Sequence, residues 1–317
     1  MKLKELIERL KMYRGLTRKS CIGALARIFS EECKYDDAGW FRVGDFYIVV
    51  SSDGITEELI RDDPFLAGYY SVLVNVNDVV AKGARPIGYA GTISSNLNHT
   101  RTMLVKGIRE ALRLYGLTLF KLHTHPDTSY DAVDGCVVGI AKNVIPSSTA
   151  RPGQSIIVAL DINGSFGSRG WVYCFDTTRG KDQNRVKMLI DGMIHIAEQN
   201  LATASRDISA PGLLGSLSML CESSGVGAVI DLNLIPSPPS IDLETWLKTY
   251  PSFGFILTSE RPSECMKYLK ESGYVASMVG KTTDDKKVVV KLGVEEEVFI
   301  DLTRESVFFK SQAPPSI

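Results

Sequence analysis

A stripe of polar side chains runs along an otherwise apolar segment at residues 64–82. Its members recur at intervals of four, three and four residues, which places them on one face of a helix: Ser71, Asn75, Asp78 and Lys82. The residues between them are mostly valine and leucine, so there is little room for a broad solvated face. A solvated face stays open as an explanation. We expect instead that the narrow stripe lines a polar site, where Asp78 binds a metal ion or hydrogen-bonds a ligand.

Further carboxylates lie at the ends of expected strands. Asp36 and Asp37 precede one strand, and Asp53 follows the buried strand expected at residues 46–50. Such residues usually cap turns or face solvent, and they form a site only if they meet Asp78 in space. Carboxylates around one point repel one another, and a divalent cation removes that cost. No basic residue stands among them as a counter-charge, and Mg²⁺ with substrate phosphates is the usual partner of such a set.

Two of the four histidines lie in the segment His123-Thr-His125-Pro-Asp127. On a strand this spacing puts both imidazoles on one face, which suits a zinc pair. The segment also resembles the His-[Ser/Thr]-His-Pro segment of JAMM-type metallopeptidases. The serine and aspartate that those enzymes add at a fixed later spacing are missing here. A zinc hydrolase and a polar loop without a catalytic role therefore both stay open.

The segment Arg206-Asp207-Ile-Ser-Ala-Pro211-Gly212 stands directly before an expected helix. A helix N-terminus with a nearby glycine is a natural anion site, and Asp207 could instead cap the helix or bind a metal ion. The chain contains neither G-x-x-x-x-G-K-[ST] nor G-x-G-x-x-G after a strand. Neither of the common glycine loops would therefore hold a nucleotide.

Strands and helices alternate along the chain and predict two α/β domains, residues 1–150 and 151–317, with a boundary turn at Arg151-Pro152-Gly153. The 317 residues are enough for two domains with sizeable cores. The first residues predict an amphipathic helix with apolar side chains on one face: Leu3, Leu6, Ile7 and Leu10.

Composition narrows the possible partners and compartment. The net charge of −1 gives no basic excess for a nucleic-acid or membrane-surface partner. The six cysteines are scattered without a C-x-x-C pair, which indicates reduced core residues. Charges interrupt the N-terminal apolar residues, unlike in a signal peptide, and no apolar run approaches the length of a membrane span. We expect a cytoplasmic protein.

Taken together, these segments resemble the superfamily of aminoimidazole ribonucleotide (AIR) synthase, which includes thiamine-monophosphate kinase, selenophosphate synthetase and the hydrogenase-maturation carbamoyl dehydratase. The segments that carry the resemblance are Asp36-Asp37-Ala38, Ser52-Asp53-Gly54, Val74-Asn-Val-Asn-Asp78, Gly83-Ala-Arg-Pro86 and Asp207-Ile-Ser-Ala-Pro-Gly-Leu-Leu-Gly215. Three others are similar to an uncharacterised branch that includes a methanogenesis-marker group: residues 69–78, Thr124-His-Pro-Asp-Thr128 and Phe175-Asp-Thr-Thr178.

The resemblance implies a PurM-like two-domain α/β fold and a homodimer whose N-terminal halves pair into a β-barrel. It also implies an enzyme that uses ATP and Mg²⁺, bound near that interface, to phosphorylate a small-molecule substrate directly or as an activation step. The Mg²⁺ ligands implied are Asp36, Asp37, Asp53 and Asp78. Asp53, Asp78 and His123 would be catalytic, and the nucleotide would be bound by Asp36, Asp37, Asn75, Asn77, Asp127 and Asp207. In this interpretation His123 faces the phosphates, and His125 either turns the other way or only shapes the loop.

Two departures from the family pattern affect the activity. Tyr35 stands where the family usually has glycine, and Lys121-Leu122 stands where it usually has a glycine pair. Glycine there lets backbone amides approach phosphate closely, and a leucine Cβ hinders that approach. A non-catalytic nucleotide-binding protein with an assembly or regulatory role is therefore the alternative to an enzyme.

Overall fold

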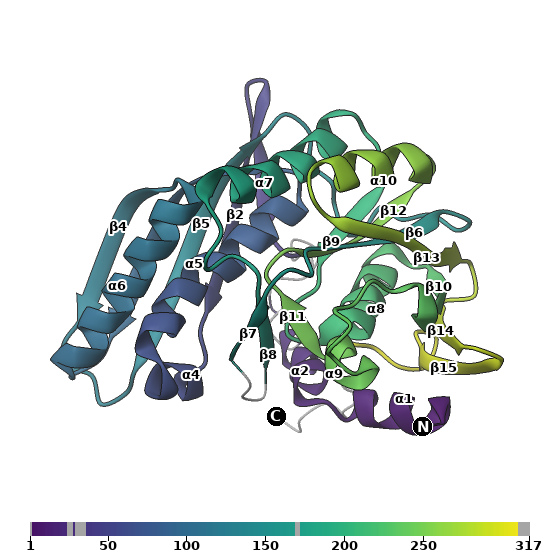
Figure 1. Cartoon of the computed structure of the whole chain (residues 1–317), viewed down its shortest axis with the longest axis horizontal. Coiled ribbons are helices and arrows are strands. Elements are labelled where there is room, and N and C mark those ends of the chain that lie inside the picture. Colours follow the sequence, from purple (N-terminus) through teal and green to yellow (C-terminus); the bar gives the residue numbers. More distant parts are fainter. Residues whose placement is uncertain (1, 24–27, 29–35, 169–171, 310–317) are drawn as a thin grey trace.

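The computed structural model describes residues 2–23, 28, 36–168 and 172–309, which form two main sheets and their covering helices (Figure 1). The mixed α/β class expected from the sequence is confirmed. Tyr35 lies outside the described residues.

The first sheet has five strands, and helices cover one of its faces (Figure 1). Its order is β1(Gly39–Val43), β2(Phe46–Gly54), β5(Ala132–Ala141), β3(Arg85–Ser94) and β4(Thr118–His125). All neighbours are antiparallel except β3 and β4, which the helix α6(Asn98–Tyr115) connects as a parallel crossover. The long helix α5(Pro64–Ala81) packs against the sheet and beside α6, with the short α4(Glu57–Asp62) before it.

The second sheet has seven strands. Its order is β15(Glu295–Asp301), β14(Lys287–Leu292), β10(Gly227–Asp231), β13(Val275–Thr283), β6(Ser155–Leu160), β12(Gly254–Ser259) and β9(Ala204–Asp207). A third, small sheet joins β11(Thr249–Pro251), β8(Tyr173–Asp176) and β7(Ser165–Ser168). The helices of this half are α7(Gln183–Glu198), α8(Gly212–Ser224), α9(Leu243–Leu247) and α10(Pro262–Glu271), with the short 3₁₀ helix η3(Leu232–Leu234).

Both faces of the second sheet are covered, so β6 is buried along its whole length. Ile157 and Ala159 face the core shared with α5, α6, α7 and the first sheet, whereas Ile156 and Val158 face the core around α8. This two-residue alternation is what strand geometry requires. The first core therefore continues from one half of the molecule into the other. It holds the two halves in a fixed position on either side of any site between them.

The N-terminal helix α1(Leu3–Lys11) packs against the second half of the chain, below β15 in Figure 1. Its four apolar residues belong to the core around α8, and the backbone N–H of Leu3 donates to Glu295 Oε2 at 2.8 Å. After it come α2(Arg14–Thr17) and the 3₁₀ helix η1(Arg18–Cys21). The division into residues 1–150 and 151–317 stays a prediction, with this helix crossing to the other side of it.

The outer face of the first sheet carries apolar side chains that no described residue covers. Large exposed examples on this face are Phe41, Val43, Phe46 and Phe120. Among the described helices, none combines the length and the apolar character that crossing a membrane requires.

Candidate metal and nucleotide site

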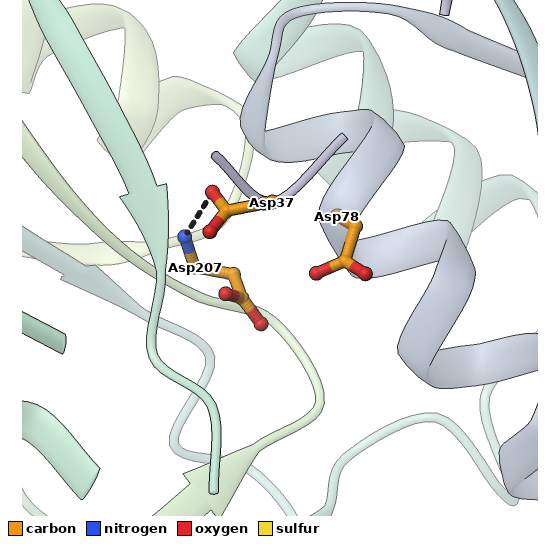
Figure 2. A group of neighbouring side chains, drawn as sticks. All are labelled: Asp37, Asp78 and Asp207. Carbon is orange, nitrogen blue, oxygen red and sulfur yellow. Dashed lines mark hydrogen bonds between the residues drawn. The ribbon is translucent and has the colours of Figure 1, made fainter. Parts of the chain in front are cut away.

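Three aspartates from distant parts of the chain converge between the two halves of the molecule (Figure 2). Asp37 lies in the turn before β1, Asp78 in the last turns of α5, and Asp207 at the end of β9. One carboxylate oxygen of each lies within 4.8 Å of the others. Hard oxygen donors at this spacing suit a small divalent cation such as Mg²⁺.

The electrostatics of this trio are unfavourable without a counter-charge. Burial raises the pKa of Asp78 well above its usual value, and the charges of Asp207, Asp53 and Asp37 add to the effect. Burial likewise raises the pKa of Asp207, and Asp37 adds to it. A bound cation would reverse both effects by stabilising the ionised carboxylates.

The hydrogen bonds leave a fully buried oxygen of the trio without a donor. Asp37 Oδ2 accepts from the backbone N–H of Asp207 at 3.3 Å, as drawn in Figure 2. Asp78 Oδ2 lies 2.6 Å from Ser51 Oγ. Asp207 Oδ2 accepts no hydrogen bond from any described residue, although Asp207 is only 1% exposed. A buried acceptor left open in this way is a position that a ligand or ion would satisfy.

Two buried cations lie beside the trio, so the expectation that no basic residue balances the carboxylates is wrong. The Lys82 ammonium lies 2.5 Å from Asp36 Oδ1 and 3.0 Å from Asp37 Oδ2. Arg206 Nε lies 3.0 Å from Asp37 Oδ1. Burial alone would lower the pKa of Lys82, but the two aspartates outweigh it and raise that pKa, so the ammonium stays charged. The sequence did not reveal this pairing because Lys82 and Asp36 meet only in the folded chain.

Of the four Mg²⁺ ligands expected from the sequence, Asp36 has other partners. Its Oδ1 accepts from Lys82, and its Oδ2 accepts from the backbone N–H of Ser147 at 2.8 Å. Burial alone would raise the pKa of Asp36, but Lys82 and Arg206 outweigh it and hold that pKa below its usual value. Asp36 is therefore engaged in an internal ion pair, and Asp207, for which metal binding was one of the alternatives left open, completes the trio.

A cavity of about 510 Å³ opens beside the trio, between the two halves of the chain. Asp53 lines it together with all three members of the trio. Its basic edge is formed by Arg18 and Lys19 of η1. Apolar side chains complete the wall: Ile22, Leu59, Val74, Val172, Met219 and Phe308. An acidic end, a basic edge and apolar walls suit a metal-bound phosphate compound with an organic part.

The two asparagines of α5 are buried, form hydrogen bonds inside the protein and do not line this cavity. Asn75 donates to the carbonyl of Ser71 at 2.8 Å, and its Oδ1 lies 2.9 Å from Ser51 Oγ. Asn77 donates to the hydroxyl of Tyr250 in β11 at 3.4 Å, which connects α5 to the small sheet. Both side chains are fully buried. Asn77 Oδ1 accepts no hydrogen bond from a described residue, but neither side chain lines the cavity beside the trio.

His123 lies on the opposite face of the first sheet. Ser51 faces Asp78, whereas the next residue, Ser52, lines a second cavity of about 410 Å³ together with His123 and Lys121. Adjacent strand residues point to opposite faces, so this second cavity lies on the face away from α5. Within one chain, His123 is therefore separated from the aspartate trio by the sheet.

His125 does not turn away from His123, so only the alternative in which His125 shapes the loop stays a prediction. The His123 and His125 rings lie edge to face with centroids 4.7 Å apart, because both side chains leave β4 on the same side. The strand does end at His125, just before Pro126. Asp127 is exposed in the following turn and lines neither cavity.

Sequence reasoning missed Ser51 and underestimated Arg206. A signal for Ser51 was present, because a strand through residues 46–54 puts Ser51 and Asp53 on one face. Arg206 was noted only as part of a segment before a helix, yet the structure puts it in β9, with its side chain 4% exposed and against Asp37.

Two family models match the chain: the N-terminal domain of AIR synthase related protein over residues 35–141, and the C-terminal domain over residues 160–293. An uncharacterized protein of Methanocaldococcus jannaschii is 33% identical over 324 residues, covering 97% of this chain and 99% of that protein. An uncharacterized protein of Synechocystis is 30% identical and covers 95% and 96%. The phosphoribosylformylglycinamidine synthase subunit PurL of Thermotoga maritima is 24% identical over 66% of this chain and 37% of its own length.

Solved structures share the fold. T. maritima PurL complexed with ADP superposes with a TM-score of 0.78 at 17% identity, covering 98% of this chain and 54% of PurL. The chain thus spans about half the length of that protein. AaThiL complexed with AMPPCP and TMP gives a TM-score of 0.69 at 18% identity, covering 94% of this chain and 98% of AaThiL. The PurM-like two-domain fold expected from the sequence is confirmed. Because the two family models together match well over half of its residues, the chain belongs to the AIR synthase-related family.

Proposed function

We propose that this protein is an ATP-dependent, Mg²⁺-requiring enzyme that phosphorylates a small-molecule substrate. The phosphorylated compound is either the final product or an activated intermediate. The observation that carries the proposal is the buried trio of Asp37, Asp78 and Asp207 at the edge of a large cavity, with one carboxylate oxygen left without a donor. Phosphoryl transfer needs mainly positioning and charge stabilisation, which a metal ion on several aspartates supplies. Relatives of the same fold have been solved with ADP, ATP and AMPPCP.

In this proposal each group has a limited role. Asp37, Asp78 and Asp207 hold the cation, and Asp53, which lines the same cavity, orients the metal-bound phosphates. Bound Mg²⁺ would neutralise phosphate charge. The basic edge of the cavity at Arg18 and Lys19 supplies further positive charge.

We also propose that the protein is a cytoplasmic homodimer in which the outer faces of two five-stranded sheets meet as a β-barrel. The support is the apolar side chains left uncovered on that face. Pairing would also bury the second cavity and His123, so His123 would act at an interface between copies. The five described cysteines are free thiols, which agrees with a reducing compartment.

Calorimetric titration with Mg·ATP and with a non-hydrolysable analogue tests the proposal directly. We expect binding that requires Mg²⁺ and is lost in Asp78→Asn. Absence of binding at millimolar nucleotide would contradict both the enzyme and any nucleotide-binding role.

A non-catalytic nucleotide-binding role is the second candidate, favoured by Lys121. Its side chain lines the second cavity beside His123, where the family usually has glycine. If this candidate is right, ATP raises the melting temperature but no candidate acceptor yields ADP or phosphate. Measured turnover with any small acceptor would exclude it.

A zinc hydrolase using His123 and His125 is the third candidate, and the structure gives it less support. Among the described residues, the only set of three or more ligand-type side chains within metal-binding reach is the aspartate trio. A catalytic zinc ion normally needs three protein ligands. We expect elemental analysis of the purified protein to find far less than one zinc per chain. Stoichiometric zinc, lost equally in His123→Ala and His125→Ala, would instead establish the zinc site.

A further inference from the structure

The side chain of Lys82 is a fully buried junction between three parts of the chain. Its ammonium lies 2.5 Å from Asp36 Oδ1, 2.7 Å from the carbonyl oxygen of Ser205 and 3.0 Å from Asp37 Oδ2. The ammonium donates hydrogen bonds to Asp36 and Ser205 and forms an ion pair with Asp37. Lys82 is 0% exposed, and it follows directly on the last residue of α5.

The segments that Lys82 joins are the same three that supply the aspartate trio. Asp36 and Asp37 form the turn before β1. Lys82 itself stands one helical turn after Asp78, and Ser205 precedes Asp207 by two residues in β9. One buried ammonium therefore holds together the backbones from which all three carboxylates project. Because side chains at i and i+4 lie on one helix face, Lys82 and Asp78 point toward the same region.

We propose that Lys82 is a positioning residue of the divalent-cation site, one that sets the separation of Asp37, Asp78 and Asp207. The inference rests on the proposed function, since it presumes that the trio binds a cation. The donor-free oxygen of Asp207, in a side chain only 1% exposed, independently marks the trio as a ligand position. Lys82 does not touch the cation. It acts through the turn at Asp36 and Asp37 and through β9.

Lys82 also neutralises two buried carboxylates, so the test must separate this counter-charge role from the proposed positioning role. Removing Lys82 alone would leave an uncompensated buried charge and would destabilise the protein whatever its role. A charge-balanced change, Lys82→Met with Asp36→Asn, removes one positive and one negative group together. Asp36→Asn alone removes only the negative group and leaves the contacts of Lys82 to Asp37 and Ser205.

The two roles predict opposite orders of cation affinity for Asp36→Asn and for Lys82→Met/Asp36→Asn. If charge alone matters, loss of the Lys82 cation from the Asp36→Asn background makes the site more negative and tightens cation binding. If Lys82 positions the ligands, the same loss weakens cation binding despite the more favourable charge. The order of the two affinities therefore separates positioning from neutralisation.

The chain offers a matched control in a second buried ion pair. The Lys181 ammonium lies 2.8 Å from Asp161 Oδ2 and also contacts the backbone carbonyls of Asn163 and Thr177. Neither Lys181 nor Asp161 lines the cavity beside the trio. Lys181→Met with Asp161→Asn makes the same chemical change away from the site.

The probe is Mn²⁺, a paramagnetic substitute for Mg²⁺. It is titrated into the full chain, and electron paramagnetic resonance measures the concentration of free Mn²⁺. We expect Lys82→Met/Asp36→Asn to bind Mn²⁺ roughly tenfold more weakly than Asp36→Asn. We expect the Lys181→Met/Asp161→Asn control to bind as the wild type does. If the methionine variant does not fold, Lys82→Gln/Asp36→Asn, which keeps a polar donor, takes its place with the same expected order.

Equal or tighter binding by the folded double variant would overturn the positioning role and leave Lys82 as a counter-charge. An equally large loss in the Lys181 control would also overturn it, because the effect would then reflect general stability. Failure of the wild type to bind Mn²⁺ would instead refute the proposed cation site itself.

Discussion

At the scale of single residues, Asp78 combines a stability cost with the proposed function. Its pKa is raised by burial and by neighbouring aspartates, so its ionised form is disfavoured in the folded protein. Ser51 Oγ lies 2.6 Å from Asp78 Oδ2 and 2.9 Å from Asn75 Oδ1, and one hydroxyl proton cannot serve both acceptors. An amide at position 78 could donate to Ser51, which would then donate to Asn75.

Asp78→Asn should therefore stabilise the protein while it abolishes the function. We expect the free energy of unfolding without metal to rise by about 1 kcal/mol, the usual scale of a single substitution. We expect Mg·ATP affinity to fall by more than roughly tenfold. Urea unfolding with a chelator present and calorimetry measure the two effects. A variant that is less stable and still binds nucleotide would contradict the site.

The pH dependence of stability follows from the same residues. The folded-state pKa values of Asp78 and Asp207 are raised, so above the unfolded pKa of about 3.9 the native state binds more protons than the unfolded state. Stability should then fall as pH rises through the folded pKa values. Asp36 acts oppositely, with its contribution lost only as pH falls below the unfolded value. The raised pKa of Lys82 keeps its contribution intact until strongly alkaline pH.

We expect the chelated protein to be less stable at pH 8 than at pH 6, and Mg²⁺ to stabilise it more at the higher pH. Metal binding requires deprotonated carboxylates, so it displaces the protons that the trio holds at low pH. Chemical unfolding at both pH values, with Mg²⁺ or with chelator, gives the four free energies. A stabilisation by Mg²⁺ that does not grow with pH would place the cation elsewhere.

At the scale of elements, the sequence predicted those whose ends carry strong local signals. The helix at residues 64–81 was expected from Asp63 and Pro64, and Asp63 does accept from the backbone N–H of Leu66 at 2.9 Å. The sequence does not predict strand β3, because it contains Pro86, Gly88 and Gly91, and proline and glycine are uncommon inside strands. In the structure, the register of β3 shifts between Pro86 and Gly88.

One helix boundary differs from what the sequence predicts. Apolar spacing predicts a helix over residues 182–203, but α7 ends at Glu198, and Asn200 adopts a left-handed conformation with φ of 52°. Residues 199–203 instead lead into β9, which carries Arg206 and Asp207. The sequence segments were enough to predict that these aspartates belong to a site. They were not enough to predict which aspartates converge, because that depends on how two sheets pack and not on local sequence.

Two segments that are far apart in the chain join the halves of the molecule at one contact. The hydroxyl of Tyr69 in α5 lies 2.7 Å from Thr178 Oγ1, just after β8. Asp176 holds that turn by accepting from the backbone N–H and the hydroxyl of Thr178, and Arg179 Nε lies 2.7 Å from its Oδ2. The next helix residue, Tyr70, and Cys174 of β8 both line the cavity, so this contact fixes part of its wall.

Tyr69→Phe should lower the free energy of unfolding by about 1 kcal/mol, the net value of a typical hydrogen bond. Asp176→Asn should cost more, because it weakens several bonds of one buried carboxylate. Urea unfolding measures both, and Tyr130→Phe, which changes a tyrosine that is 56% exposed, is the control with no expected effect. Equal stabilities for Tyr69→Phe and Tyr130→Phe would show that the contact contributes nothing.

At the scale of the whole molecule, the first sheet has one face with helices and one face without. Exposed Phe41 and Phe120 stand on β1 and β4, the two edge strands, at 58% and 52% exposure. Large apolar side chains exposed on both edge strands are costly in water and indicate a surface that another molecule covers. A second copy fits best, because two identical sheets related by a twofold axis can close into a barrel that removes their open edges.

Phe41→Glu together with Phe120→Glu should therefore give a monomer, because a charge buried in an apolar interface without a partner is strongly unfavourable. Val294→Glu changes an equally apolar residue in the turn between β14 and β15, which is fully exposed and far from the first sheet along the chain. Sedimentation velocity should show a dimer for the wild type and for this control, and a monomer for the double variant. Mg²⁺ affinity should persist in the monomer, because all three aspartates come from one chain. Activity should be lost if the proposed pairing is right, because His123 lines the cavity on the face that a second copy would cover. A monomeric wild type, or a double variant that still dimerises, would show that another surface or partner covers this sheet.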